Sequence, residues 1–234
     1  MSAPGRREEL ALRLADVRRR MAKACEAAGR DVSELTLIAV TKTKPASDVR
    51  LLYELGLADV GENRDSEAAP KAAQCADLNL TWHFVGQLQT NKAASVVRYA
   101  SVVHSVDRLR LIRALGRAAR GAGRVVECLV EVSLDGDPAR GGAVAGEVPA
   151  LAEALAAEEA LTLGGVMAVA PLSMAPADAF ARLLASAAAV RAVRPGATVI
   201  SAGMSGDLEA AVGAGATHLR IGTALLGDRE PRVR

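Results

Sequence analysis

The stretch LTLIAVTKTKP, residues 35–45, begins as a run of apolar and β-branched residues and ends in two lysines and a proline. Its first part is typical of a buried strand in a parallel sheet. In a dinucleotide-binding open sheet the first strand is normally followed by the turn G-x-G-x-x-G, whereas the turn here reads T-K-T-K-P. The stretch therefore favours a closed barrel over a doubly wound open sheet, and it places Lys42 and Lys44 directly after the first strand.

The same strand signal recurs along the chain in alternation with amphipathic segments. Eight apolar runs are candidate strands: 35–42, 58–62, 81–86, 101–106, 124–134, 161–170, 197–202 and 217–226. Helical periodicity and helix-start residues follow the first seven runs, in segments that begin at Pro45, Asp65, Asn91, Asp107, Glu147, Pro176 and Asp207. The pattern predicts an α/β protein with a (β/α)8 TIM-barrel fold. No stretch has the composition of a linker, so residues 1–234 are expected to form a single domain.

An extra helix is expected before the first strand. Over residues 7–29, apolar side chains recur at steps of three and four: Leu10, Leu14, Val17, Met21 and Cys25. The basic residues 18–20 lie on the other side of this helix and are expected to be a solvated face.

Composition excludes several classes of partner. The 29 basic and 27 acidic residues leave a net charge of +2, and tryptophan, tyrosine and phenylalanine are scarce, so nucleic acid is not expected. The three cysteines are far apart in the sequence and have no metal-ligand or redox spacing, which fits a reducing compartment and no metal site. The charged N-terminus does not resemble a signal peptide, and no apolar run has membrane-spanning length. We expect a cytoplasmic protein with no membrane partner.

A barrel collects functional residues at the carboxyl ends of its strands. The polar or flexible residues that the sequence places there are Lys42, Asn63, His83, His104, Ser205, Arg220, Gly222 and Thr223. Ser205 is a candidate N-cap for the helix that begins near Asp207, and helix N-termini bind anions. The loops after strands seven and eight of such barrels commonly hold phosphate. An ordinary cap and turn would explain Ser205 alone, but the two loops together favour a phosphate site.

Arg220 and Gly222 are two residues apart, so they share a face of an extended strand, and Arg220 is expected in the barrel mouth. A neutral lysine amine forms an imine with an aldehyde, and burial or a neighbouring cation such as Lys44 favours the neutral amine. By itself Lys42 would be interpreted as a solvated strand end. Together with the phosphate loops and Arg220, it indicates a phosphorylated aldehyde as ligand.

Five motifs are together similar to one known family. AVTKTKP from Ala39, GEN from Gly61, WHFVGQLQTNK from Trp82, GMSGD from Gly203 and VGAGATHLRIGTALLG from Val212 resemble, in order, the pyridoxal phosphate homeostasis protein family. The resemblance extends over residues 10–229 and implies a barrel like the N-terminal domain of alanine racemase.

The resemblance also implies roles for individual residues. Pyridoxal 5′-phosphate would be an internal aldimine on Lys42, and Arg220 would face the pyridine nitrogen. Asn63 would lie near the ring, and the phosphate would be held by Ser205, Gly222 and Thr223. The fifteen-residue step from Ser205 to Arg220 is similar to the corresponding step in the racemases, which favours Ser205 and leaves Ser201 as the alternative. The chain departs from the family pattern in SAGMSG from Ser201 and at Thr41, where the family often has serine.

Three functions are compatible with these residues. The first is intracellular homeostasis and delivery of pyridoxal 5′-phosphate to apo-enzymes by a monomer that need not be an enzyme. The second is a low-activity amino-acid racemase, and the third is an aldolase that uses Lys42 without a cofactor. An arginine opposite the pyridine nitrogen leaves the ring neutral, which weakens carbanion stabilisation.

Racemisation needs a second base in addition to Lys42. The racemases that the chain resembles take theirs, a tyrosine, from a C-terminal domain of a partner subunit. Tyr53 and Tyr99 lie in or at the ends of predicted helices, away from the barrel mouth. His83 and His104 are candidates at strand ends, and satisfying a backbone group is the alternative role for each.

Overall fold

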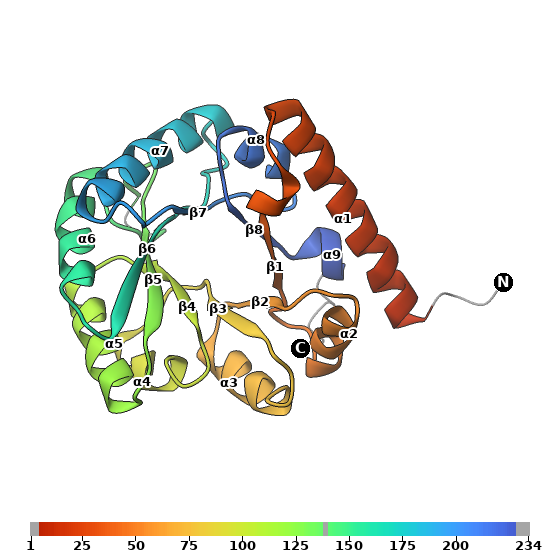
Figure 1. Ribbon diagram of the computed structural model, residues 1–234, viewed down its shortest axis with the longest axis horizontal. Coiled ribbons are helices and arrows are strands. Elements are labelled where there is room, and N and C mark those ends of the chain that lie inside the picture. The colour runs from red at the N-terminus through yellow and green to blue at the C-terminus, as the bar shows by residue number, and fades with distance from the viewer. Residues whose placement is uncertain (1–4, 138–139, 228–234) are drawn as a thin grey trace.

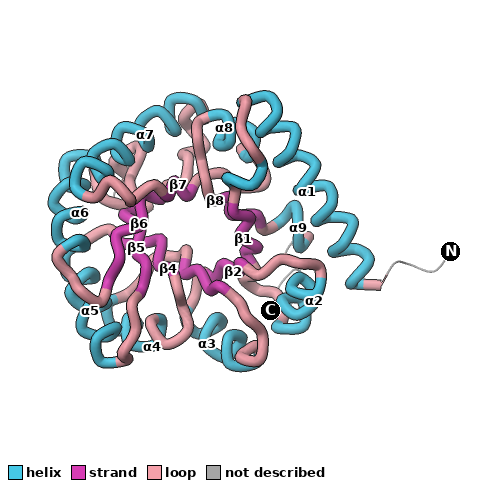
Figure 2. Tube along the Cα trace, in the orientation of Figure 1, coloured by secondary structure: helices cyan, strands magenta, loops and turns pink. Residues whose placement is uncertain are grey.

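The computed structural model describes residues 5–137 and 140–227, and at its centre is a closed barrel of eight parallel strands (Figures 1 and 2). The strands are β1 Thr36–Val40, β2 Asp59–Glu62, β3 Thr81–Phe84, β4 Val102–Val106, β5 Val126–Glu131, β6 Leu161–Met167, β7 Val199–Ser201 and β8 His218–Ile221. Each strand pairs with the next one, and β8 pairs with β1 through Ile38 and Arg220. The closed barrel confirms the predicted fold class.

Helices form the outer layer around the strands (Figure 2). The longer ones after the first strand are α2 Ala46–Glu54, α3 Asp65–Gln74, α5 Leu109–Gly121, α6 Val148–Ala156 and α7 Pro176–Val193. The shorter ones are α4 Ala93–Val96, α8 Leu208–Gly213 and α9 Thr223–Leu226. The main hydrophobic core lies between the strands and this layer of helices. Along β8, for example, Leu219 and Ile221 belong to that core, whereas Arg220 projects to the inside of the barrel.

The predicted N-terminal helix is present as α1, Arg6–Ala28. All five residues of its predicted apolar face are buried. The helix ends at Gly29, whose φ of 63° is readily adopted by glycine. It packs along the outside of the barrel beside α8 and α9 (Figure 1). This contact brings α1 close to the loops that follow the last two strands.

Two predicted elements differ in detail from the structure. The run 217–226 is not one strand: β8 ends at Ile221, and the short helix α9 follows from Thr223. The amides of Leu225 and Leu226 both donate to the carbonyl of Gly222, which begins this helical turn. The segment from Asn91 forms a 3-10 turn, Thr90–Lys92, and then only the short α4. Apolar composition alone does not separate a buried strand from a buried helical turn.

In the described part of the chain, no helix has both the length and the apolar character that a bilayer crossing requires.

Candidate functional site

A cavity of about 410 Å³ opens at the carboxyl ends of the strands. This volume lies within the range of pockets for small molecules and cofactors. Its lining residues are Val40, Lys42, Thr43, Lys44, Asn63, Val85, Val169, Met204, Ser205, Gly206, Arg220, Gly222, Thr223, Leu226 and Gly227. All six residues predicted for cofactor binding are in this lining, although they come from four different loops or strand ends.

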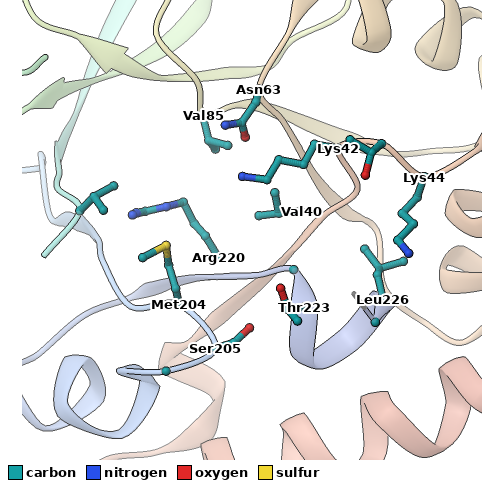
Figure 3. Close-up of a pocket in the computed structure, with 15 residues that line it drawn as sticks. Val40, Lys42, Lys44, Asn63, Val85, Met204, Ser205, Arg220, Thr223 and Leu226 are labelled. Carbon is teal, nitrogen blue, oxygen red and sulfur yellow. The ribbon is translucent and has the colours of Figure 1, made fainter. Parts of the chain in front are cut away.

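Lys42 extends across this cavity towards Arg220 (Figure 3). The guanidinium of Arg220 is directed away from Lys42, to Ser201 Oγ and the carbonyl of Ala168. Lys42 follows β1 in a tight turn, in which the amide of Lys44 donates to the carbonyl of Thr41 at 3.0 Å. The side chain of Lys44 turns away from Lys42 towards Leu226 (Figure 3). The two lysines of the motif therefore occupy different parts of the cavity wall, and Lys42 is the one that points at Arg220.

The cationic character of this lining is its main electrostatic feature. Three of the lining side chains are basic, namely Lys42, Lys44 and Arg220. Within the described residues, no acidic side chain lines this cavity. Opposite charges attract strongly in a partly enclosed site, where water screens them less than it does at the surface. The cavity therefore suits an anionic ligand.

Two adjacent loops form one wall of the cavity, the one after β7 and the one after β8. The backbone amide of Ala224 donates to Ser205 Oγ at 3.2 Å, which joins the two loops. Gly203 lies at a φ of 92°, and a Cβ there would meet Ala211 Cβ at 2.6 Å, so a larger residue would displace the loop. The hydroxyls of Ser205 and Thr223 lie on this wall below Arg220 (Figure 3).

The predicted capping role of Ser205 is wrong. Asp207 is the N-cap of α8, and its Oδ1 accepts from the amide of Met204 at 2.6 Å. The Ser205 hydroxyl is bonded instead to the first turn of α9. Ser205 lies three residues before Leu208, the first residue of α8, which is too far upstream for it to be the N-cap.

Arg220 is a buried cation with neutral partners. Its side chain donates to Ser201 Oγ at 2.6 Å and to the carbonyl of Ala168 at 2.8 Å. Burial lowers the pKa of Arg220 to about 10, with Asp207 and Glu131 opposing the shift. The guanidinium stays charged at neutral pH, and it can donate hydrogen bonds but cannot accept one.

A chain of hydrogen bonds runs from Arg220 down through the barrel interior. Ser201 Oγ contacts His104 Nδ1, His104 Nε2 contacts His83 Nδ1, and His83 Nε2 contacts Asp59 Oδ1, each at 2.9 Å. Arginine can only donate, so the remaining Ser201 proton is available to His104. If each group then donates to the next and ends at the Asp59 carboxylate, every contact is satisfied without an added proton. Burial, assisted by His83 and Arg220, lowers the pKa of His104 well below its usual value, which agrees with a neutral ring.

The positions of these hydrogen-bonded residues correct two predictions for the barrel mouth. His83 and His104 are buried in the middle of their strands, beneath the cavity rather than in its lining. Ser201, the alternative phosphate ligand, is likewise buried and is bonded to Arg220 and His104. Strand position indicated that these residues point inward, but it did not specify their depth in the barrel.

The tyrosines lie away from the cavity, as expected. Tyr99 packs edge-to-face on Trp82 with ring centroids 6.3 Å apart, and its hydroxyl contacts Asp65 Oδ1 at 3.5 Å. Tyr53 lies in the outer helix α2. Neither residue is in the lining of the cavity.

The sequence interpretation missed two residues near the site. Arg20 of α1 donates to the carbonyl of Ser205 at 3.0 Å and pairs with Glu209, so this part of the basic face supports the loop after β7 rather than being solvated. Glu131, at the end of β5, lines a smaller cavity of about 170 Å³ that shares Val169 with the main one. Burial, with a smaller contribution from Asp107, raises the pKa of Glu131 to about 7. The position of Glu131 at a strand end was the available signal.

Known proteins resemble the chain over nearly its whole length. Residues 12–230 match the family model described as alanine racemase, N-terminal domain. The pyridoxal phosphate homeostasis protein of Mycobacterium tuberculosis H37Rv is 44% identical, over 98% of this chain and 96% of that protein.

Solved structures agree with these sequence matches. PipY of Synechococcus elongatus PCC7942, solved with PLP bound, has a TM-score of 0.81 and 35% identity, covering 93% of this chain and 100% of that one. Alanine racemase from Corynebacterium glutamicum, at 13% identity and a TM-score of 0.69, shares the fold over 94% of this chain and 60% of its own. The chain belongs to the pyridoxal phosphate homeostasis protein family, within the fold family of the alanine racemase N-terminal domain.

Proposed function

We propose that this protein holds pyridoxal 5′-phosphate reversibly on Lys42 and serves in the homeostasis and delivery of that cofactor inside the cell. One observation carries the proposal: Lys42 extends towards Arg220 in a cationic cavity bounded by two loops suited to phosphate. The printed name of the M. tuberculosis relative and the PLP-bound PipY structure support it.

The covalent link would need only Lys42 and water. The lysine amine replaces the aldehyde oxygen, so that a carbon–nitrogen double bond forms as one water leaves, and hydrolysis reverses the step. Reversibility is what a storage and delivery protein requires.

The remaining lining residues would hold and orient the ligand. Ser205, Gly222 and Thr223 belong to the two loops that would receive the phosphate. Asn63 would contact the ring from the side of Lys42, as its position in Figure 3 suggests. Arg220 would face the pyridine nitrogen.

Two features favour a carrier over a catalyst. A cofactor enzyme that stabilises carbanions strongly needs a protonated pyridine nitrogen, and Arg220 cannot accept that proton. Racemisation also needs a second base, but Tyr99 and His104 are both outside the lining of the cavity. A carrier that delivers its cofactor to apo-enzymes is the simplest arrangement consistent with these features.

The test is to add pyridoxal 5′-phosphate to the purified protein and to its Lys42→Ala and Lys44→Ala variants. We expect a visible absorption band in the wild type and in Lys44→Ala, and none in Lys42→Ala. Borohydride reduction followed by peptide mass spectrometry should place the pyridoxyl group on Lys42. A wild type without the band, or a pyridoxyl group on another lysine, would refute the proposal. Scrambling of chiral alanine would favour the racemase, and borohydride trapping of a sugar phosphate on Lys42 would favour the aldolase.

A further inference from the structure

A buried polar cluster lies directly behind the turn that carries Lys42. Its members are Thr41, Glu62 at the end of β2 and Lys71 of α3, which are 0%, 0% and 6% exposed. Thr41 Oγ1 donates to Glu62 Oε1 at 2.6 Å, and Lys71 Nζ donates to the carbonyl of Thr41 at 2.9 Å and to Glu62 Oε1. The carbonyl of Thr41 is also the acceptor that closes the turn to Lys44, so Lys71 holds the turn at its first residue.

The cluster and the cavity use alternate residues of the same two segments. Lys42 and Asn63 line the cavity, whereas the side chains of the preceding residues, Thr41 and Glu62, bond to each other on the other side, where Glu62 also contacts α3. This follows from the alternation of side chains along an extended chain. The paired register of β1 and β2 continues to this point, because the amide of Thr41 donates to the carbonyl of Gly61 at 2.9 Å. The cluster can therefore fix the backbone at Lys42 without entering the ligand space.

The third residue of the turn needs outside support. Thr43 has a φ of 67°, and no other non-glycine residue in the described ranges has a positive φ. This conformation is unfavourable for a β-branched residue and persists only where neighbours enforce it. The amide of Thr43 donates to Glu67 Oε2 of α3 at 3.0 Å. Helix α3 thus contacts the turn at two points, through Lys71 and Glu67.

We infer that the buried Glu62–Lys71 pair, assisted by Glu67, is a positioning device that holds the Thr41–Lys44 turn and aims the amine of Lys42 into the cavity. The inference rests on the proposed function, in which Lys42 bonds the cofactor. A buried ion pair is commonly no more stabilising than apolar residues of similar volume, so stability alone does not explain its placement here. Its contacts with the peptide that precedes Lys42 do explain it.

The test uses the double variant Glu62→Met/Lys71→Met, which removes both charges and leaves no lone charge buried. The two probes are pyridoxal 5′-phosphate, which can bond Lys42, and pyridoxine 5′-phosphate, which lacks the aldehyde but keeps the ring and phosphate. Misplacing a reacting group by about 1 Å can slow its reaction about 100-fold. We therefore expect the affinity for pyridoxal 5′-phosphate to fall about tenfold or more. Affinity for the second should stay within about threefold, because its contacts do not involve Lys42.

The matched control is Arg120→Met/Glu158→Met, which removes an ion pair from the outer side of the barrel and should change neither affinity. If the cluster variant loses affinity for both probes equally, or for neither, Glu62 and Lys71 have only a structural role and the inference is wrong. A loss confined to pyridoxal 5′-phosphate supports it.

A cofactor-free measurement separates this inference from the proposed function. In amide hydrogen exchange without ligand, the segment 41–44 of the cluster variant should exchange about tenfold faster or more, while β3 stays as protected as in the wild type. Unchanged exchange at 41–44 would overturn the positioning role even if Lys42 binds the cofactor. Faster exchange in a protein whose wild type shows no absorption band would support the positioning of the turn and refute only the cofactor function.

Discussion

Two buried polar networks flank the cavity, and they differ in whether their charged groups are paired. On the Lys42 side, the carboxylate of Glu62 and the ammonium of Lys71 compensate each other within one cluster. On the Arg220 side, the guanidinium is bonded to the Ser201 hydroxyl and the Ala168 carbonyl, and no carboxylate in the described residues lies within salt-bridge distance of it.

The difference indicates a division of labour around the ligand. A self-compensated pair can hold the backbone without adding net charge to the cavity. A cation with neutral partners keeps its field, which lowers the pKa of His104 and His218 in addition to the lowering by burial. The network on the Lys42 side therefore fixes the position of the backbone, and Arg220 on the other side gives the cavity a positive electrostatic potential. Three predictions test this contrast.

The largest effect is expected where the compensated network is cut in half. Lys71→Met leaves the Glu62 carboxylate buried without its partner, and such losses cost about 3–5 kcal/mol. The free energy of unfolding, measured by chemical denaturation, should fall by that amount. Lys23→Met, at an exposed position of α1, should change it by less than about 0.5 kcal/mol. A loss below about 1 kcal/mol in Lys71→Met would mean that Glu62 is solvated and that the contrast does not hold.

A second effect is expected at Glu131, a carboxyl group in the smaller neighbouring cavity whose anionic form is disfavoured by burial. The pKa of Glu131 is raised from 4.5 to about 7, so its contribution to stability is complete below about pH 4.5 and is lost as the pH rises through about 7. The loss should amount to about 2–3 kcal/mol in the wild type, and Glu131→Gln should flatten this part of the curve. Unfolding measured from pH 4.5 to 8 checks it, with the exposed Glu153→Gln as control. An equally steep Glu131→Gln curve would contradict the prediction.

The smallest effect is expected at acid pH in the hydrogen-bond chain that contains His104. The pKa of His104 is depressed in the folded protein, so its contribution to stability is present above about pH 6.5 and is lost as the pH falls towards the folded value. Stability should therefore fall as the pH is lowered below about 6.5, and this contribution should be absent from His104→Gln, which does not titrate. Nitrogen-15 NMR of the wild type should also show the proton of neutral His104 on Nε2. A proton on Nδ1 would reverse the direction assigned to the hydrogen-bond chain.

Much of the site was predictable because a parallel barrel brings all its carboxyl strand ends to one opening. Lys42, Asn63 and Arg220 are far apart in the sequence, yet their positions at the ends of apolar runs were enough to bring them together. The same reasoning misjudged Ser201 and His104, because a strand position specifies the direction of a side chain better than its depth. It also missed Lys71, since a lysine on an amphipathic helix normally lies in water.

The sequence by itself determined the order of strands and helices, the buried face of α1 and six of the residues that line the cavity. These properties follow from local periodicity and from the topology that it implies. Only the tertiary structure decided that Glu62 pairs with Lys71, that Arg20 supports the loop after β7 and that Arg220 has neutral partners. Each of these contacts depends on how close packing brings separate elements together, and the partner of a buried polar group is set by that packing and not by its neighbours in the sequence.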